Sequence, residues 1–285
     1  MSPLARRRRR AALLFLLPAC TMFAIYVIYP ILSSVVLSFY DWDGVGARSF
    51  VGLANYRELV DTDTFYTALK NNVLWLVLML LAPPIGLAFA LYLNQSVKGM
   101  RLLKSLFFAP FVVPGVVIGL VFSWFYDPAF GLLHLIVGHG VPVLGNEHSA
   151  TFGIIAAALW PQIPFCMILF LTGLTGINPE IVEAGRLEGA RGWSLLWHIV
   201  LPQLRPATFM AVTLTVIGAL RSFDLISVMT SGGPFDSSTV LAYFMYDQAI
   251  KYFRFGYSAA IAVVLFLIMM IFIAYQLRRL LRAER

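Results

Sequence analysis

Hydrophobic residues in this chain occur in long uninterrupted runs rather than in the short alternating patterns of a soluble domain. Several windows contain no Asp, Glu, Lys or Arg, among them 11–40, 71–97, 105–126, 148–179 and 255–277. A sixth, 206–220, extends to about residue 228 if Arg221 and Asp224 are accepted near its end. Because a helix needs about 20 apolar residues to cross a bilayer, the pattern predicts six transmembrane helices. We place these spans at about 13–39, 69–94, 105–126, 151–173, 207–228 and 256–277.

The composition supports an all-α membrane protein, with residues 1–285 as a single transmembrane domain. Hydrophobic residues make up 60% of the chain and charged residues 12%, with a mean hydropathy of +0.83. An ordinary globular domain is only about half apolar, so we expect lipid to be the solvent for much of the surface. The net charge of +7 does not indicate nucleic-acid binding, because the basic residues cluster beside the spans.

The first apolar window imitates a secretory signal, since Arg6–Arg10 precede the sequence AALLFLLPAC. Hydrophobicity nevertheless continues without a break from Thr21 to Tyr40, so cleavage after this motif would divide a span. We therefore interpret the window as an uncleaved first helix, started or kinked by Pro18 and Pro30.

Basic residues are distributed unevenly around the spans and predict the orientation of the chain. Lys and Arg in short loops are retained on the cytoplasmic side of a membrane. With the N-terminus inside, most of the 21 basic residues fall in cytoplasmic pieces: Arg6–Arg10, Lys98, Arg101, Lys104, Arg186, Arg191, Arg205, Arg278, Arg279, Arg282 and Arg285. The prediction therefore places both termini, and the loop 174–205, in the cytoplasm.

The loop 174–205 contains a polar, glycine-rich stretch, EAGRLEGARGWSLLWHIVLPQLRP. Asn178, Pro179 and Glu180 have the features of a helix start: a capping side chain, a proline in the first turn, and an acid favoured by the helix dipole. A helix from Pro179 to Arg191 would be about 20 Å long, too short to cross a membrane. Periodicity alone leaves two interpretations, a surface helix at the lipid headgroups or a docking element for a cytoplasmic partner.

The same loop contains a spaced set of residues: Glu183-Ala184-Gly185, then Gly189 after three residues, and Ile199-x-Leu201-Pro202 after nine more. This set resembles the EAA signature of bacterial ABC importer permeases. Gly185 departs from it where the family usually has alanine, and Glu188 where sugar permeases usually have aspartate. Other stretches resemble the carbohydrate-uptake subfamily, in particular its first-permease type similar to the maltose and glycerol-3-phosphate permease subunits: YPI at 29–31, FVGLANYREL at 50–59, APFVVPGVVIGLVFSWFYDPAFG at 109–131 and SGGP at 231–234.

The resemblance implies a type I ABC importer permease, a bundle of six core helices with a cytoplasmic coupling helix in a bacterial or archaeal cytoplasmic (inner) membrane. It implies three partners: a second, different permease subunit, a cytoplasmic ABC ATPase dimer and an extracytoplasmic solute-binding protein. The solute would be a sugar, a polyol or a glycerol-3-phosphate-like molecule. Coupling to the ATPase would involve Glu183, Ala184, Gly185, Glu188, Gly189 and Pro202. We expect Glu183 to contact the ATPase, Gly189 to permit a turn or close packing, and Pro202 to fix the link to the fifth span.

Motifs for catalysis or cofactor binding are missing from the sequence. The chain has no G-x-x-x-x-G-K-[ST] stretch to hold ATP phosphates, so we expect a transport subunit rather than an enzyme, with ATP and Mg²⁺ on the separate ATPase. Cys20 and Cys166 lie inside predicted spans and indicate neither a disulfide framework nor a metal site.

Candidate residues for the solute pathway are those that offer a sugar hydrogen bonds or an aromatic face in the fourth and fifth spans: Trp160, Gln162, Phe165, Thr215 and Ser222. The alternative is that Trp160 and Phe165 face lipid and that Thr215 bonds its own helix backbone. Arg221 and Asp224 are also candidates, because ionisable residues within a span are costly and usually pair or line a watery path. Three residues apart on a helix, they share a face, either as an outer gate or at the water boundary.

Other transport and enzyme classes are less consistent with the sequence. A carrier driven by an ion gradient needs carboxylates within the membrane and usually more spans, and Asp224 is the one candidate. A membrane enzyme would need a catalytic motif, and neither H-E-x-x-H nor G-x-S-x-G is present. A channel would leave the EAA spacing unexplained. The gradient-driven carrier using Asp224 is therefore the alternative to an ABC importer permease.

Overall fold

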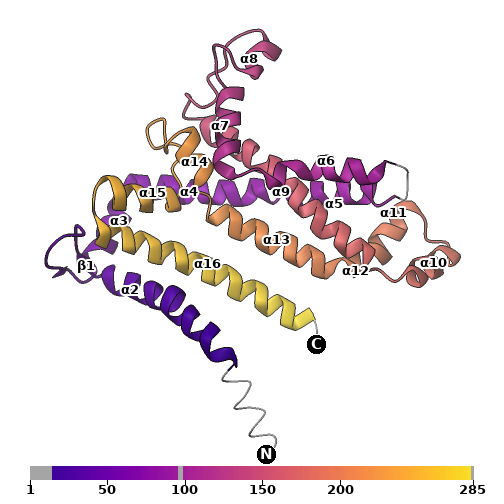
Figure 1. Cartoon of the computed structure of the whole chain (residues 1–285), viewed down its shortest axis with the longest axis horizontal. Coiled ribbons are helices and arrows are strands. Elements are labelled where there is room, and N and C mark those ends of the chain that lie inside the picture. The colour runs from indigo at the N-terminus through magenta and orange to yellow at the C-terminus, as the bar shows by residue number, and fades with distance from the viewer. Residues whose placement is uncertain (1–14, 96–98, 284–285) are drawn as a thin grey trace, which may run out of the picture. The chain divides into compact units, whose positions relative to one another are not determined.

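The computed structural model describes residues 15–95 and 99–283, which fold mainly into helices (Figure 1). The chain separates into two compact units, one of residues 1–62 and 245–267 and the other of residues 63–244 and 268–285. Arg6–Arg10, Lys98 and Arg285, which support the predicted orientation, lie outside the described residues.

The first unit combines the first and last long helices with a short hairpin. Its elements are the helix Phe15–Leu37, which contains the π-helical turn η1 (Ala24–Ile28) and α2 (Tyr29–Leu37), then β1 (Tyr40–Asp41), β2 (Ser49–Phe50), α3 (Ala54–Asp61), η3 (Asp247–Lys251) and the first part of α16 (Phe255–Ala283). The two strands pair antiparallel, with Tyr40 opposite Phe50. The all-α prediction missed this hairpin because strands of two residues leave no alternating pattern in the sequence.

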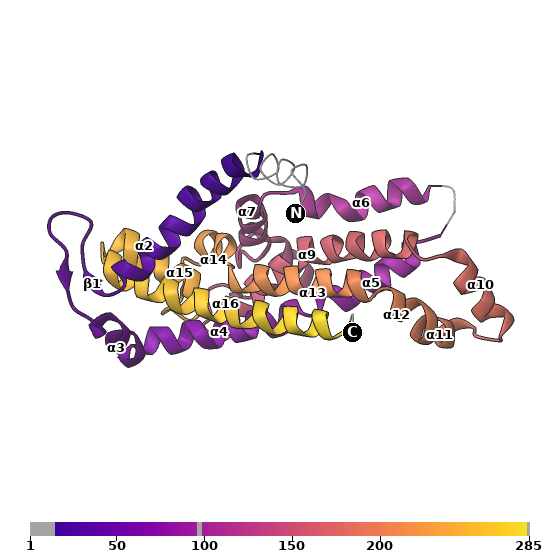
Figure 2. The same cartoon turned by 90° about the horizontal axis from the view of Figure 1, so that it is seen from below.

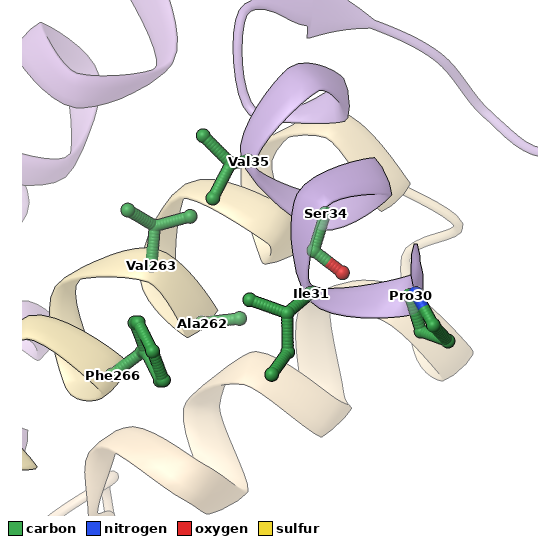
Figure 3. Close-up of a pocket in the computed structure, with 7 residues that line it drawn as sticks. All are labelled: Pro30, Ile31, Ser34, Val35, Ala262, Val263 and Phe266. Atoms are coloured by element: carbon green, nitrogen blue, oxygen red, sulfur yellow. The ribbon is translucent and has the colours of Figure 1, made fainter. Parts of the chain in front are cut away.

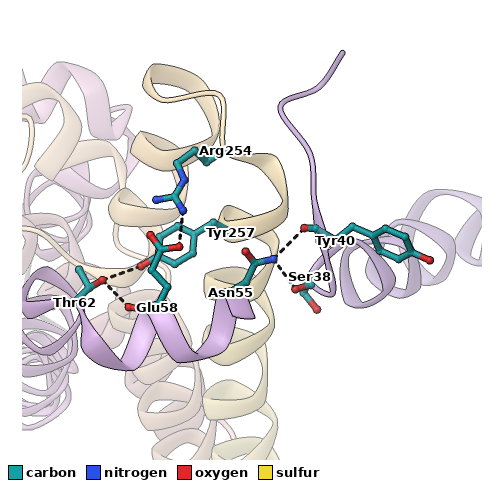
Figure 4. A network of polar contacts seen from close by, with 7 residues as sticks. All are labelled: Ser38, Tyr40, Asn55, Glu58, Thr62, Arg254 and Tyr257. Atoms are coloured by element: carbon teal, nitrogen blue, oxygen red, sulfur yellow. Dashed lines mark hydrogen bonds and ion pairs between the residues drawn. The ribbon is translucent and has the colours of Figure 1, made fainter. Parts of the chain in front are cut away.

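Polar contacts hold the hairpin and α3 of the first unit together (Figure 4). The amide nitrogen of Asn55 donates to the carbonyl oxygens of Ser38 (2.9 Å) and Tyr40 (3.0 Å). Arg254, just before α16, forms an ion pair of 2.6 Å with Glu58 of α3. The hydrogen bond from Arg254 to Glu58 raises the pKa of the guanidinium. These contacts fix the connection that follows α2 against the start of α16.

An apolar groove of about 200 Å³ lies between α2 and the first part of α16 (Figure 3). It is lined by Pro30, Ile31, Ser34, Val35, Ala262, Val263 and Phe266. Ser34 is the one polar side chain among these residues, so the facing sides of the two helices suit an apolar environment.

The second unit consists of helices joined by loops, with no strand in its described part. Its elements are α4 (Asp63–Met79), α5 (Ala82–Leu93), α6 (Met100–Val112), α7 (Gly115–Phe125), α8 (Leu132–Val137), α9 (Ala150–Thr175), α10 (Pro179–Leu187), α11 (Gly192–Leu195), the π-helical turn η2 (Leu196–Val200), α12 (Leu201–Gln203), α13 (Arg205–Leu220), α14 (Asp224–Met229) and α15 (Leu241–Tyr246).

The core of the second unit forms where α5 packs along α9 (Figures 1 and 2). A Cβ atom on Gly86 of α5 would lie 2.7 Å from the Cβ of Cys166 and 2.8 Å from the backbone nitrogen of Met167. The missing side chain therefore lets the two helix backbones approach closely, as small residues do in membrane bundles. Leu93 and Phe170 are also buried in this cluster.

The third predicted span is not one straight helix. Instead of a continuous helix over 105–126, the structure has α6 and α7, which meet at an angle of 94°. Val113 and Pro114 between them have extended backbone conformations, with ψ angles of 129° and 141°. A residue before proline is disfavoured in the helical conformation, which accounts for the break. Because hydrophobicity continues across the bend, the apolar window 105–126 does not reveal it.

Five described helices are long and apolar enough to cross a membrane, or six when the bent pair α6–α7 counts as one span. The five are Phe15–Leu37, Asp63–Leu93, Ala150–Thr175, Arg205–Met229 and Phe255–Arg278. The predicted number of spans therefore agrees with the structure when the bent pair is included.

Candidate functional site

The polar segment, defined here as residues 178–203, connects α9 to α13 and contains α10, η2 and the short helices beside it. Figures 1 and 2 show these helices beyond the ends of α9 and α13. The Asn178 side chain accepts a hydrogen bond of 3.0 Å from the backbone nitrogen of Glu180, which confirms the predicted N-cap. The predicted helix end was wrong, because α10 stops at Leu187 rather than at Arg191.

Gly189 ends α10 by a left-handed turn. Its φ angle is +94°, a conformation that glycine adopts without steric penalty. Its N–H donates to the carbonyl of Arg186 (3.1 Å), and the N–H of Ala190 donates to the carbonyl of Gly185 (2.9 Å). These two bonds form a Schellman motif. No heavy atom lies within 4 Å of a Cβ built on Gly189, so of the two expected roles, a turn or close packing, the structure favours the turn.

The two halves of the EAA signature touch each other. Gly185 is buried, and a Cβ atom at this position would collide with the terminal methyl of Ile199. Leu195 also approaches this position, at 3.6 Å. The departure from alanine at Gly185 therefore creates the space that Ile199 fills. Residues 14 positions apart in the sequence thus hold α10 against the helical stretch that follows.

The chain remains helical through Pro202, and the helix ends within LPQLRP, before the fifth span begins. α11, η2 and α12 follow one another without interruption from Gly192 to Gln203. Pro202 lies one residue before the last residue of this helical stretch. The helix ends at Leu204, whose φ and ψ angles are −82° and 4°, and α13 begins at the next residue.

The outer side of the polar segment exposes both charged and apolar side chains. Glu183, Ala184, Glu188 and Pro202 are all exposed, and in the part of the chain that the structure describes, no hydrogen bond or ion pair involves the Glu183 carboxylate.

Three large apolar side chains of the polar segment were missed by the sequence reading. Leu187 is 89% exposed, Trp193 72% and Trp197 52%. The two indole rings pack edge to face with their centroids 5.8 Å apart. Three large apolar groups left uncovered on a helical elbow are typical of a protein or lipid contact surface. Two Trp residues four positions apart in a polar loop were the available sequence signal.

Gln162 and Thr215, two of the pathway candidates, form a contact between α9 and α13. The Gln162 amide nitrogen donates to the Thr215 hydroxyl at 2.9 Å, and the Cys166 sulfur lies 3.5 Å from the same hydroxyl. Thr215 has no exposed surface. Thr215 therefore presents nothing to a solute in this conformation and acts by positioning Gln162, which is partly exposed. The bond to its own helix backbone, considered as the alternative, is replaced by this bond between helices.

Trp160 and Phe165 are directed toward α6 and α7. Trp160 is 42% exposed, and its ring lies edge to face with Phe122 at 5.7 Å. Phe165 stacks on Phe111, with ring centroids 5.0 Å apart and an interplanar angle of 20°. Trp160 also lines a mainly apolar groove of about 390 Å³ with Phe89, Leu106, Phe107, Pro110, Ile163 and Pro164. The aromatic candidates thus gather around the bent pair of helices, away from Thr215.

Arg221 and Asp224 do not form the pair that their spacing allowed. Helix α13 ends at Leu220 and α14 begins at Asp224, so the two residues do not share one helix face. Both are described by the structure, and no ion pair joins them. Asp224 instead lies against the start of α7, with its carboxylate 3.3 Å from a Cβ built on Gly115.

Ser222 bonds to the backbone at the end of α13. Its hydroxyl donates to the backbone carbonyl of Gly218 at 3.3 Å. Within residues 15–95 and 99–283, no group of three or more His, Cys, Asp or Glu side chains is arranged to hold a metal ion.

Relatives of the chain are permeases over nearly their whole length. It is 33% identical over 269 residues to a probable ABC transporter permease protein of Pyrococcus horikoshii, covering 91% of each chain. It is 31% identical over 280 residues to the trehalose/maltose transport system permease protein MalF of Thermococcus litoralis, covering 95% of this chain and 94% of the relative.

The fold matches that of a solved transporter subunit. A crystal structure of a bacterial ABC transporter that imports the acidic polysaccharide alginate has a TM-score of 0.86 and 20% sequence identity, with both chains covered completely. A crystal structure of bacterial alginate ABC transporter bound to a periplasmic protein carrying an alginate pentasaccharide has a TM-score of 0.83 and 19% identity, with 96% of each chain covered. The fold is that of a type I ABC importer permease.

A family assignment follows from these likenesses and from a direct match to a family's sequence profile. The profile described as "Binding-protein-dependent transport system inner membrane component" matches residues 82–283, which include the polar segment and all the pathway candidates. The chain therefore belongs to this family of membrane transport subunits, the permeases of ATP-driven importers that depend on a solute-binding protein.

Proposed function

We propose that this chain forms half of the translocation pathway of an importer for a sugar, a polyol or a glycerol-3-phosphate-like solute. The other half would be a second, different permease subunit. A cytoplasmic ABC ATPase dimer, carrying ATP and Mg²⁺, would bind the polar segment, and both termini of the chain would lie on that side of the membrane. A solute-binding protein would deliver the solute on the opposite side.

The observation that carries this proposal is the construction of the polar segment as a stiff elbow. Ile199 fills the space over Gly185, and the turn at Gly189 ends α10. These contacts within the segment hold α10 against the helical stretch that follows it. Glu183 and Leu187 remain exposed on it. A partner that moves these two side chains therefore moves the elbow as one body, and with it the ends of α9 and α13.

The solute class follows from the relatives and from the side chains around the bent pair of helices. The relative from Thermococcus litoralis is named for trehalose and maltose, and the structural relatives import a polysaccharide. Trp160 and Phe165 offer aromatic faces on which the apolar face of a sugar ring stacks, and Gln162 retains a carbonyl oxygen for a hydroxyl group. Glu183, Ala184, Gly185, Glu188, Gly189 and Pro202 remain our proposed coupling residues.

The test is co-purification of the tagged chain with its ATPase in mild detergent, followed by ATP-dependent transport in proteoliposomes. Glu183→Ala and Leu187→Ala each remove an exposed contact, so we expect the recovered ATPase or the transport rate to fall about tenfold or more, as for a central interface residue. Glu180→Gln is the matched control, because this exposed acid lies in the same helix and the Asn178 cap bonds its backbone rather than its side chain.

Unchanged recovery and transport in both variants would contradict a coupling role for α10. A chain that moves solute in vesicles without ATP would contradict the whole proposal and would favour the gradient-driven carrier. Membership of the importer family does not favour that alternative.

A further inference from the structure

The loop 230–240 lies at the end of the second unit away from the polar segment. The Thr151 hydroxyl, in the first turn of α9, donates to the Ser237 carbonyl of this loop at 3.2 Å. Thr175, the last residue of α9, leads directly into the polar segment. The helix between these two residues is about 36 Å long, more than the apolar thickness of about 30 Å of a bilayer. The loop and the polar segment therefore face opposite sides of the membrane.

Two asparagines of α4 hold this loop in place. The amide nitrogen of Asn71 donates to the carbonyls of Ser237 (2.7 Å) and Thr239 (2.8 Å). The side-chain oxygen of Asn72 accepts from the backbone nitrogen of Leu241 at 2.9 Å. Both asparagines are buried. The loop backbone is thus fixed to a transmembrane helix and does not depend on its own turns alone.

Hydrogen bonds inside the loop add to this support. Ser238 donates from its hydroxyl to the Gly233 carbonyl at 2.6 Å and lies 2.8 Å from the Thr230 hydroxyl. The Thr239 hydroxyl donates to the Gly232 carbonyl at 3.2 Å. These side chains hold a backbone with an unusual shape, because Ser231, Gly232, Phe235 and Asp236 have positive φ angles of 49°, 83°, 50° and 58°.

Phe235 stands at the exposed tip of this rigid loop. Its side chain is 91% exposed, whereas Gly232 and residues 238–240 of the same loop are buried. A bulky residue in the left-handed region is an outlier, and such strained positions persist only where the surrounding structure determines them. The hydrogen bonds that fix the loop therefore fix the backbone at a position that exposes an aromatic side chain.

We propose that Phe235 is an anchor on which the solute-binding protein docks. This rests on the proposed function, because a binding-protein-dependent importer receives that protein on the face opposite its ATPase. Aromatic residues dominate the binding energy of protein interfaces, and a loop whose backbone is already ordered loses little freedom on binding. Asp236 beside it is also exposed, which favours an aqueous protein partner over insertion of the ring into lipid.

The test uses the complete transporter in proteoliposomes and the binding protein that stimulates its ATP hydrolysis. Phe235→Ala should raise the concentration of loaded binding protein needed for half-maximal stimulation about tenfold or more. Phe235→Tyr keeps the ring and should stay within about twofold of the wild type. Phe152→Ala is the matched control, because Phe152 is 51% exposed at the same end of the unit but on the flank of α9.

A photo-crosslinking residue at position 235 gives a second readout that does not depend on full activity. The expected product is an adduct with the binding protein, and it should form only when that protein is added. Adducts with lipid or with the second permease alone would overturn the proposal, as would equal half-maximal concentrations for Phe235→Ala and the wild type. If no binding protein stimulates the wild type, the proposed function itself fails, which is a distinguishable result.

Discussion

The polar segment before α13 and the loop 230–240 after α14 both expose side chains, but different kinds of contact hold the two regions in place. Before α13, the polar segment is stabilised by its own residues: Gly185 contacts Ile199, and Gly189 forms the turn between them. After α14, the loop 230–240 is stabilised by a residue remote in sequence, since Asn71 is 166 residues from Ser237. The first arrangement can move as a unit, whereas the second is fixed to α4 and α9. These different constructions suit the roles that we propose, a segment moved by the ATPase and a fixed surface for docking.

Replacing one glycine by alanine in each region should give the largest difference in the free energy of unfolding. Gly232→Ala should lower the free energy of unfolding by about 3 kcal/mol, because the new Cβ would lie 2.6 Å from the Thr239 hydroxyl and 2.8 Å from the Tyr243 ring in addition to the positive φ. Gly189→Ala should cost about 1 kcal/mol, because only the φ angle opposes it. Unfolding in mixed detergent micelles measures both variants, and a larger loss for Gly189→Ala would break the comparison.

Removal of the remote anchor should produce the next largest effect. Asn71→Ala deprives two loop carbonyls of the amide that bonds them, so we expect a loss of about 2 kcal/mol. The same variant should weaken stimulation by the binding protein if the loop positions Phe235. Asn94→Ala is the control, because Asn94 is exposed at the end of α5. A change below about 0.5 kcal/mol, typical of a surface substitution, would show that Asn71 is not the anchor.

Substitutions at the contact between Gly185 and Ile199 should change the free energy of unfolding least. Their effects should nevertheless depend on each other. Gly185→Ala forces the flexible end of Ile199 to move, so we expect a loss of about 1 kcal/mol or less. Ile199→Val removes the methyl group that collides, so it should cost less in the Gly185→Ala background than in the wild type. A double-mutant cycle measures this difference. Strictly additive losses would mean that the two halves of the signature act independently.

Much of the fold could be predicted because its causes are local in the sequence. Apolar windows predicted the spans, and Asn178 before Pro179 predicted the start of α10. The bend between α6 and α7 was missed because Pro114 interrupts a window that is apolar on both sides. The early end of α10 was missed because Gly189 was counted within the helix, although only its φ angle makes it a terminator.

The candidate site residues also divide into those that the sequence could predict and those that it could not. The residues of the polar segment are contiguous, so their spacing could be recognised, although Leu187 and its exposure could not. The pathway candidates come from separate helices, and the structure assigned them different neighbours: Gln162 lies with Thr215, and Phe165 with Phe111. Arg221 and Asp224 failed to pair because α13 ends between them.

The sequence by itself determined that the chain is a membrane protein, how many times it can cross, and which permease family it belongs to. These properties depend on hydrophobic length and on residues at fixed spacing. The tertiary structure alone decided which buried amides hold the loop 230–240 and which side chains remain uncovered. Burial and hydrogen bonding depend on residues brought together from distant parts of the chain, and no local pattern specifies those contacts.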